Sequence, residues 1–179
     1  MRGLDPRIHV LWRSEAGLGY PGPPAFDSLT PSAKFSAVTQ ELAIALAQIN
    51  PTVGDVAGNL AKIRVARGEA RRLGADLVLF SELVVSGYPP EDLVLKPAFQ
   101  AACRDAVESL ARDTADGGPA LLLGTPWLDD GKLYNAALLL CEGAIAGKRF
   151  KMDLPNYGVF DEKRLFSAAP PQGHHGRGR

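Results

Sequence analysis

The chain has 179 residues, of which 46% are hydrophobic and 22% charged, and this ordinary globular composition excludes a wholly disordered or fibrous protein. Lysine plus arginine (20) equals aspartate plus glutamate (20), so the net charge gives no electrostatic footprint for nucleic acid or for an anionic membrane. Two cysteines are too few for a disulfide framework and no apolar run is long enough to span a membrane, so we expect a cytoplasmic protein.

The positions of the histidines restrict the chemistry. All three lie near the ends of the chain, at His9, His174 and His175. The body of the chain therefore cannot hold a Ser-His-Asp triad, a Cys-His pair or a metal site built from histidines, and we expect no metal site. Acid–base chemistry there must use carboxylates, lysines, tyrosines or a thiol.

The two ends of the chain are expected to lie outside the domain. Residues 1–39 contain the run Tyr-Pro-Gly-Pro-Pro at 20–24, which blocks helix and sheet alike, so we predict a disordered or mis-annotated leader. Residues 169–179 have no large apolar side chain to bury and are predicted to be a disordered tail. The domain is therefore expected to span residues 40–168.

The first half of the domain predicts two strands separated by a helix. Residues 42–49 alternate large and small apolar side chains, as a partly buried strand does. Asp55 is placed to cap a helix that runs to about residue 73, where Gly74 follows. Residues 76–80 form a short apolar strand of the kind found at the centre of a sheet. The helix carries four arginines that we expect on a solvated face: Arg64, Arg67, Arg71 and Arg72.

The second half predicts one helix and three strands. Pro97 begins a helix over about 97–115, and strands are expected at 119–126, 133–141 and 144–151. This order predicts an α/β fold with a mixed sheet and two helices on one face. The other face has no helix in this chain to cover it. We therefore expect the chain to fold poorly alone unless other residues or another subunit cover that face.

Two charged residues stand where strands end. Glu82 is the first charged residue after the strand at 76–80, and Lys151 ends the last strand. Ligands of α/β proteins gather at the carboxyl ends of strands, so the two could share a crevice. The alternatives remain open at this point, because a carboxylate can simply cap a loop and a lone lysine can simply be solvated.

Three segments carry a family resemblance. Residues 81–93 read SELVVSGYPPEDL, residues 151–164 read KMDLPNYGVFDEKR, and residues 47–55 read AQINPTVGD. In this order they resemble the glutamate motif, the lysine motif and the opening strand of the carbon–nitrogen hydrolase (nitrilase) superfamily. Within it they are most similar to the N-terminal glutaminase domains of glutamine-dependent NAD+ synthetases.

The resemblance implies a nitrilase-like αββα sandwich, of which this chain would be the N-terminal part, and a Cys-Glu-Lys mechanism. Glu82 would be the general base and Lys151 would stabilise the oxyanion. Tyr88, Tyr157 and Glu162 match positions that bind the substrate, glutamine. The ammonia released would serve the ATP-dependent amidation of deamido-NAD to NAD+, and the family tends to form homo-oligomers.

The nucleophile and the synthetase domain are expected to be missing. The family places its cysteine downstream of the lysine motif, where this chain ends. Cys103 falls on the apolar side of a helix, and Cys141 lies upstream of Lys151 in a predicted hairpin, so neither is expected to replace it. ATP and Mg²⁺ would be cofactors of the absent synthetase domain only. We therefore predict that this chain is inactive alone.

Two other functions remain open. The chain could be a fragment of a stand-alone amidase of the same superfamily that acts on another small amide. It could also be a non-catalytic remnant that serves as an interaction module through its uncovered sheet face.

Overall fold

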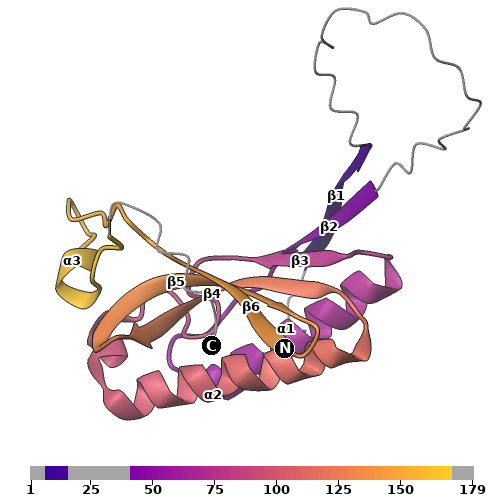
Figure 1. The fold of residues 1–179 in the computed structure, drawn as a ribbon. Coiled ribbons are helices and arrows are strands. Elements are labelled where there is room, and N and C mark those ends of the chain that lie inside the picture. The colour runs from indigo at the N-terminus through magenta and orange to yellow at the C-terminus, as the bar shows by residue number, and fades with distance from the viewer. Residues whose placement is uncertain (1–6, 16–40, 171–179) are drawn as a thin grey trace, which may run out of the picture.

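The computed structural model describes residues 7–15 and 41–170 (Figure 1). The described elements, in chain order, are β1 (Arg7–Glu15), β2 (Glu41–Gln48), α1 (Val56–Arg72), β3 (Leu77–Phe80), the 3₁₀ helix η1 (Glu91–Leu95), α2 (Pro97–Asp113), the 3₁₀ helix η2 (Thr114–Asp116), β4 (Ala120–Asp129), β5 (Lys132–Cys141), β6 (Ala144–Phe150) and α3 (Glu162–Leu165). No helix of this described part is long and apolar enough to cross a membrane.

The described strands form one mixed sheet with the order β1-β2-β3-β4-β5-β6. β2, β3 and β4 run parallel, whereas the pairs β1–β2, β4–β5 and β5–β6 are antiparallel. α1 and α2 lie side by side beneath the sheet, and α3 lies apart from them beyond one end of it (Figure 1). The predicted mixed sheet with two helices on one face is therefore confirmed.

β1 is a difference from the sequence prediction. Residues 7–15 fall within the leader that is predicted to be disordered or mis-annotated, whereas their backbone pairs antiparallel with β2, from Arg7 opposite Gln48 to Glu15 opposite Glu41. The physical reason is visible in the sequence Ile-His-Val-Leu-Trp at 8–12, whose branched and aromatic residues favour a strand. The remainder of that predicted leader, and residues 171–179 of the predicted tail, lie outside the described residues.

The core lies between the sheet and the two helices. Alternate residues of the central strands, such as Val78 and Leu121, are fully buried and belong to one cluster with Ile63 of α1 and Leu110 of α2. Because side chains alternate across a strand, the residues between them face the other side of the sheet. The helices therefore cover one face only.

The uncovered face carries a row of leucines. Leu46, Leu79, Leu122 and Leu139 are successive partners across β2, β3, β4 and β5. None of the four belongs to the buried core, and Leu79 is 37% exposed. This apolar surface agrees with the expectation that the second face lacks cover in the described part of the chain.

The arginines of α1 do not share one environment. Arg67 was expected on a solvated face, but it is only 8% exposed and that prediction is wrong. Its guanidinium donates to the carbonyl of Pro119 at 2.8 Å and pairs with Asp116 at 2.6 Å. Because these acceptors lie in the turn before β4, Arg67 ties α1 to the start of that strand. Helical periodicity alone could not identify partners that are about 50 residues away.

Candidate functional site

Glu82 stands at the carboxyl end of β3, in a sharp turn of the backbone. Leu83, the next residue, has a φ of +50°, a conformation that non-glycine residues rarely adopt. The turn lies directly against β4 at Gly124, where a Cβ would come within 2.4 Å of the Leu83 nitrogen and 2.9 Å of the Glu82 Cα. Only glycine therefore lets the backbone of Glu82 approach the sheet this closely.

A buried amide fixes the loop that follows Glu82. Asn59 of α1 is fully buried, and its side-chain nitrogen donates to the carbonyls of Thr52 and Val85. Its side-chain oxygen accepts from the Thr52 amide at 2.7 Å. One side chain thus joins the loop after β2 to the loop after β3. Both loops border the site, so Asn59 helps to hold the Glu82 turn in place.

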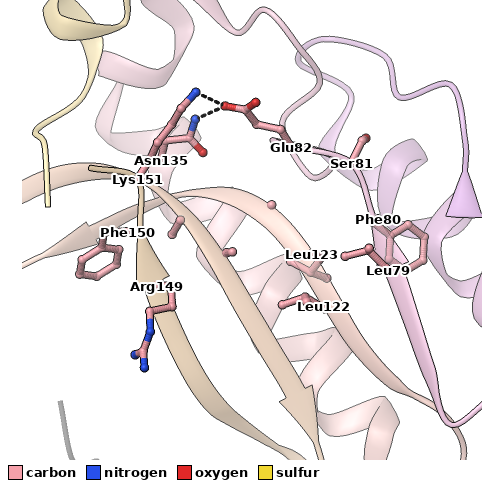
Figure 2. A pocket seen from close by; sticks show the side chains of 13 residues that line it. Leu79, Phe80, Ser81, Glu82, Leu122, Leu123, Asn135, Arg149, Phe150 and Lys151 are labelled. Atoms are coloured by element: carbon pink, nitrogen blue, oxygen red, sulfur yellow. Dashed lines mark hydrogen bonds and ion pairs between the residues drawn. The ribbon is translucent and has the colours of Figure 1, made fainter. Parts of the chain in front are cut away.

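Lys151 follows β6 immediately, and its backbone is tied to β5. The Lys151 amide donates to the carbonyl of Asn135 at 2.9 Å. The residue therefore continues the sheet register at the same end where β3 terminates. In contrast, the side chain of Arg149, two residues earlier, points away from Glu82 (Figure 2).

The side chains of Glu82, Lys151, Glu162 and Asn135 meet at this end of the sheet. The Lys151 ammonium donates to Glu82 Oε1 at 2.8 Å and to Glu162 Oε1 at 3.0 Å. Asn135 Nδ2 donates to the same Glu82 oxygen at 2.5 Å (Figure 2). The structure therefore brings together three of the five residues that the sequence predicted for the site: Glu82, Lys151 and Glu162.

The two carboxylates keep Lys151 charged. Partial burial would lower the pKa of the ammonium, but the hydrogen bonds and charges of Glu82 and Glu162 more than compensate, so the pKa of Lys151 lies above its ordinary value. The Glu162 side chain is only 7% exposed, whereas that of Glu82 is 46% exposed. Lys151 is thus a fixed cation between one buried and one accessible carboxylate.

Two adjoining cavities meet at Glu82. One, of about 350 Å³, has Glu82, Asn135 and Lys151 at one end and apolar side chains that include Leu79 and Leu122. The other, of about 330 Å³, is lined by Asn50, Pro51, Ser81, Glu82 and Tyr88. A small molecule in either cavity would lie beside the Glu82 carboxylate. Glu82, together with the preceding Ser81, therefore lines both cavities.

The two predicted tyrosines differ in their placement. Tyr88 lines the second cavity, and partial burial together with the charges of Glu162 and Glu82 raises the pKa of its hydroxyl. Tyr157 is 71% exposed, packs edge-on against Phe160 and lines neither cavity. The structure thus places Tyr88 at the site and leaves Tyr157 beside it in the surface loop.

Arg164 holds the short helix that carries Glu162. Its guanidinium bonds to Asp161 at 2.6 Å, to Asp92 of η1, and lies 3.8 Å from Glu91. These contacts join α3 to η1, which follows the Glu82 loop. The sequence predicted neither α3 nor η1, because each is too short to show a helical period.

Neither cysteine of the chain lies at this site. Cys103 is fully buried in α2, and burial raises the pKa of its thiol to about 12. Cys141 ends β5, six residues beyond Asn135, which corresponds to about 20 Å along a strand. Cys141 is thus at the opposite end of the sheet from Lys151.

Asn135 is the site residue that the sequence analysis missed. It is 5% exposed and lies in β5 among apolar residues, where an amide needs a partner. A single polar residue inside an apolar strand was the available signal. Its partner could not be identified, because that required the register between β5 and the ends of β3 and β6.

The described residues hold no group of three or more His, Cys, Asp or Glu side chains that could bind a metal ion.

Comparison with known proteins identifies relatives of this chain. The family model described as carbon–nitrogen hydrolase matches residues 43–178. The glutamine-dependent NAD(+) synthetase of Rhodobacter capsulatus is 44% identical over 133 residues, which are 74% of this chain and 24% of that protein. The corresponding protein of Thermotoga maritima is 44% identical over 128 residues, which are 71% of this chain and 22% of that protein.

Solved structures give the same relationship. The glutamine-dependent NAD+ synthetase of Acinetobacter baumannii, in complex with ADP, aligns with a TM-score of 0.67 and 36% identity over 71% of this chain and 24% of that one. An amidase from Nesterenkonia sp. aligns with a TM-score of 0.59 and 27% identity over 74% of this chain and 49% of that one. This chain spans about a quarter of the length of the curated relatives it matches.

Proposed function

This chain belongs to the carbon–nitrogen hydrolase family, and we propose that it supplies the base and the oxyanion-stabilising cation of a site that hydrolyses the side-chain amide of glutamine. The observation that carries the proposal is the contact of Lys151 with both Glu82 and Glu162 at the accessible end of the sheet. A cation and a carboxylate side by side are what amide hydrolysis by a thiol requires.

The proposed reaction has two halves, the formation of a thioester and its hydrolysis by water. Glu82 takes the proton of a thiol as the sulfur attacks the amide carbon, and Lys151 stabilises the negative charge that forms on the carbonyl oxygen. The carbon–nitrogen bond then breaks as Glu82 returns the proton to the departing ammonia. Water attacks the resulting thioester, its proton passes through Glu82 to the sulfur, and glutamate leaves.

The remaining predicted residues support substrate binding. Glu162 is buried against Lys151 and would hold the ammonium in place, while Tyr88 lines a cavity beside Glu82. Tyr157 would reach glutamine only if the loop that carries it closed over the site. These roles are part of the proposal.

The sulfur would come from neither cysteine of this chain, since both lie away from Lys151. Structures of the Nesterenkonia sp. AN1 amidase record covalent addition at the active site cysteine of that protein. We therefore propose that this chain alone does not hydrolyse glutamine.

Further parts of the proposal concern the larger enzyme. Because the curated relatives are glutamine-dependent NAD(+) synthetases, the ammonia would serve the ATP-dependent amidation of deamido-NAD. ATP and Mg²⁺ would be required by that second reaction only, and no step above involves them. A homo-oligomeric assembly and a cytoplasmic location, which suits two unpaired cysteines, complete the proposal.

A stand-alone amidase is the second candidate. It is favoured by the structural likeness to the Nesterenkonia sp. amidase, in which this chain covers about half of the protein rather than a quarter. Sequence identity favours the first proposal, because among the solved structures it is 36% with the Acinetobacter baumannii synthetase and 27% with that amidase. Hydrolysis of acetamide in preference to glutamine would support the second candidate.

The test is a chimera in which residues 43–168 replace the matching segment of the Rhodobacter capsulatus relative. We expect glutaminase activity that falls by about 10²–10⁴-fold in Glu82→Gln and by about 10²–10³-fold in Lys151→Met. Lys148→Met is the control, because Lys148 lies in β6, the strand that Lys151 follows, but pairs with Asp129. A folded chimera with no activity, or full activity in both site variants, would contradict the proposal.

A further inference from the structure

Asn135 bonds to the side chain of Glu82 and to the backbone of Lys151 from a strand that lies between theirs. Its side-chain nitrogen donates to Glu82 Oε1 at 2.5 Å, and its backbone carbonyl accepts the Lys151 amide at 2.9 Å. β5 carries Asn135, whereas Glu82 follows β3 and Lys151 follows β6. A single buried residue therefore links the Glu82 carboxylate to the backbone from which the Lys151 side chain extends.

The two oxygens of Glu82 are used differently. Oε1 accepts from both Asn135 Nδ2 and the Lys151 ammonium. Among the described residues, Oε2 accepts no hydrogen bond. Because an ionised carboxylate is an acceptor at both oxygens, Oε2 keeps its capacity to receive a proton. In Figure 2 the two donors lie on one side of the carboxylate and Oε2 points away from them.

We propose that Asn135 is a positioning residue that locks Glu82 Oε1 against Lys151 and so leaves Oε2 as the oxygen that exchanges protons during catalysis. This inference rests on the proposed function, because the proton transfer belongs to the proposed hydrolysis. The positioning itself can be tested without substrate.

The chemistry of an amide suits this task. The Glu82 side chain is 46% exposed, so without a second donor it could rotate about the single contact with Lys151. A second cation at position 135 would stabilise the carboxylate further, but it would also make the base weaker. A neutral amide donates a hydrogen bond in a fixed direction and adds no charge. Its 5% exposure keeps it in one orientation.

The test compares two replacements of Asn135 that should have opposite effects on Lys151. In Asn135→Ala, Glu82 is free to leave the ammonium, so the pKa of Lys151 should fall toward its ordinary value. In Asn135→Asp, which has nearly the same shape, a third carboxylate joins Glu82 and Glu162 near the ammonium, so the pKa of Lys151 should rise further. Both are measured in the full chain by NMR titration of the labelled Lys151 side chain.

Asn50→Ala is the matched control, because Asn50 lines the neighbouring cavity beside Glu82 and its side chain makes no hydrogen bond to Glu82. We expect the pKa of Lys151 to stay unchanged in this variant. In the unaltered chain, one Asn135 side-chain amide proton should resonate downfield and return to an ordinary position in Glu82→Ala.

The outcomes separate positioning from a general structural role. Loosening of the sheet would move the pKa of Lys151 in the same direction in both Asn135 variants, and that result would overturn the inference. An Asn135 amide signal that does not respond to Glu82→Ala would also overturn it, even if Asn135→Ala failed to fold. Because no glutamine and no thiol are used, the inference can fail while the proposed hydrolysis stands, and the reverse also holds.

Discussion

Glu82 and Lys151 are 69 residues apart in the sequence, and their side chains meet at 2.8 Å. Their strands are not neighbours, since β4 and β5 lie between β3 and β6. The contact therefore depends on the register of the whole sheet and on the turn that carries Glu82 back across β4. A small displacement of any of these strands would separate the two groups.

Because the pKa of Lys151 is raised, part of the free energy of unfolding changes with pH in the alkaline range. A raised pKa means that the folded chain holds this proton more tightly than the unfolded chain does. The contribution is therefore complete below the ordinary value of 10.5 and is lost as the pH rises through the folded-state pKa.

We thus expect the unfolding free energy to fall less steeply above pH 10.5 in Lys151→Met than in the unaltered chain, as measured by urea unfolding between pH 9 and about pH 12. Lys148→Met should follow the unaltered chain, because Lys148 pairs with Asp129, whose side chain is 40% exposed, whereas Lys151 also pairs with the buried Glu162. Identical pH profiles for Lys151→Met and the unaltered chain would show that the pair does not stabilise the fold.

Gly124 should be intolerant of any side chain. A Cβ there would overlap the backbone of Glu82 and Leu83, which cannot move without lifting the turn from β4. We expect Gly124→Ala to cost about 1–3 kcal/mol of unfolding free energy. The control is Gly147→Ala in β6, whose Cβ would lie 3.8 Å from the Leu139 Cβ, an ordinary contact. Equal urea midpoints for the two variants would contradict this explanation.

The sequence predicted the elements that have a clear period. The strand at 76–80 and the helix from Asp55 are confirmed to within a residue or two, because apolar spacing and a capping carboxylate are local signals. Glu82 and Lys151 could be found for the same reason, since each stands at a strand end. Their motif resemblance then gave them roles.

Long-range contacts were not predictable in this way. Asn135 and Gly124 act through partners on other strands, and Arg67 through a turn about 50 residues away. The local sequence of Asn135 shows only a polar residue within an apolar strand, and that of Gly124 or Arg67 gives no sign of a distant partner. Only the sheet register reveals what each one touches.

Arg164 should control the order of α3. Without its guanidinium, the carboxylates of Asp92 and Asp161 would face each other unpaired across the junction with η1. We expect Arg164→Met to speed hydrogen exchange at the Phe166 amide, which donates to the Glu162 carbonyl at 2.8 Å. Arg72→Met removes an ion pair within α1 and should leave that amide unchanged. Unaltered exchange in Arg164→Met would mean that packing alone holds α3.

The leucine row predicts how the isolated chain behaves. Leu79 and Leu122 are neighbours on the face that neither α1 nor α2 covers, and apolar side chains gathered on a surface favour association. We expect the chain to self-associate as its concentration rises, and the double variant Leu79→Glu, Leu122→Glu to remain monomeric in sedimentation velocity. Leu128→Glu, at a leucine that is 42% exposed outside this row, should associate like the unaltered chain. A monomeric unaltered chain at every concentration would contradict the role assigned to this face.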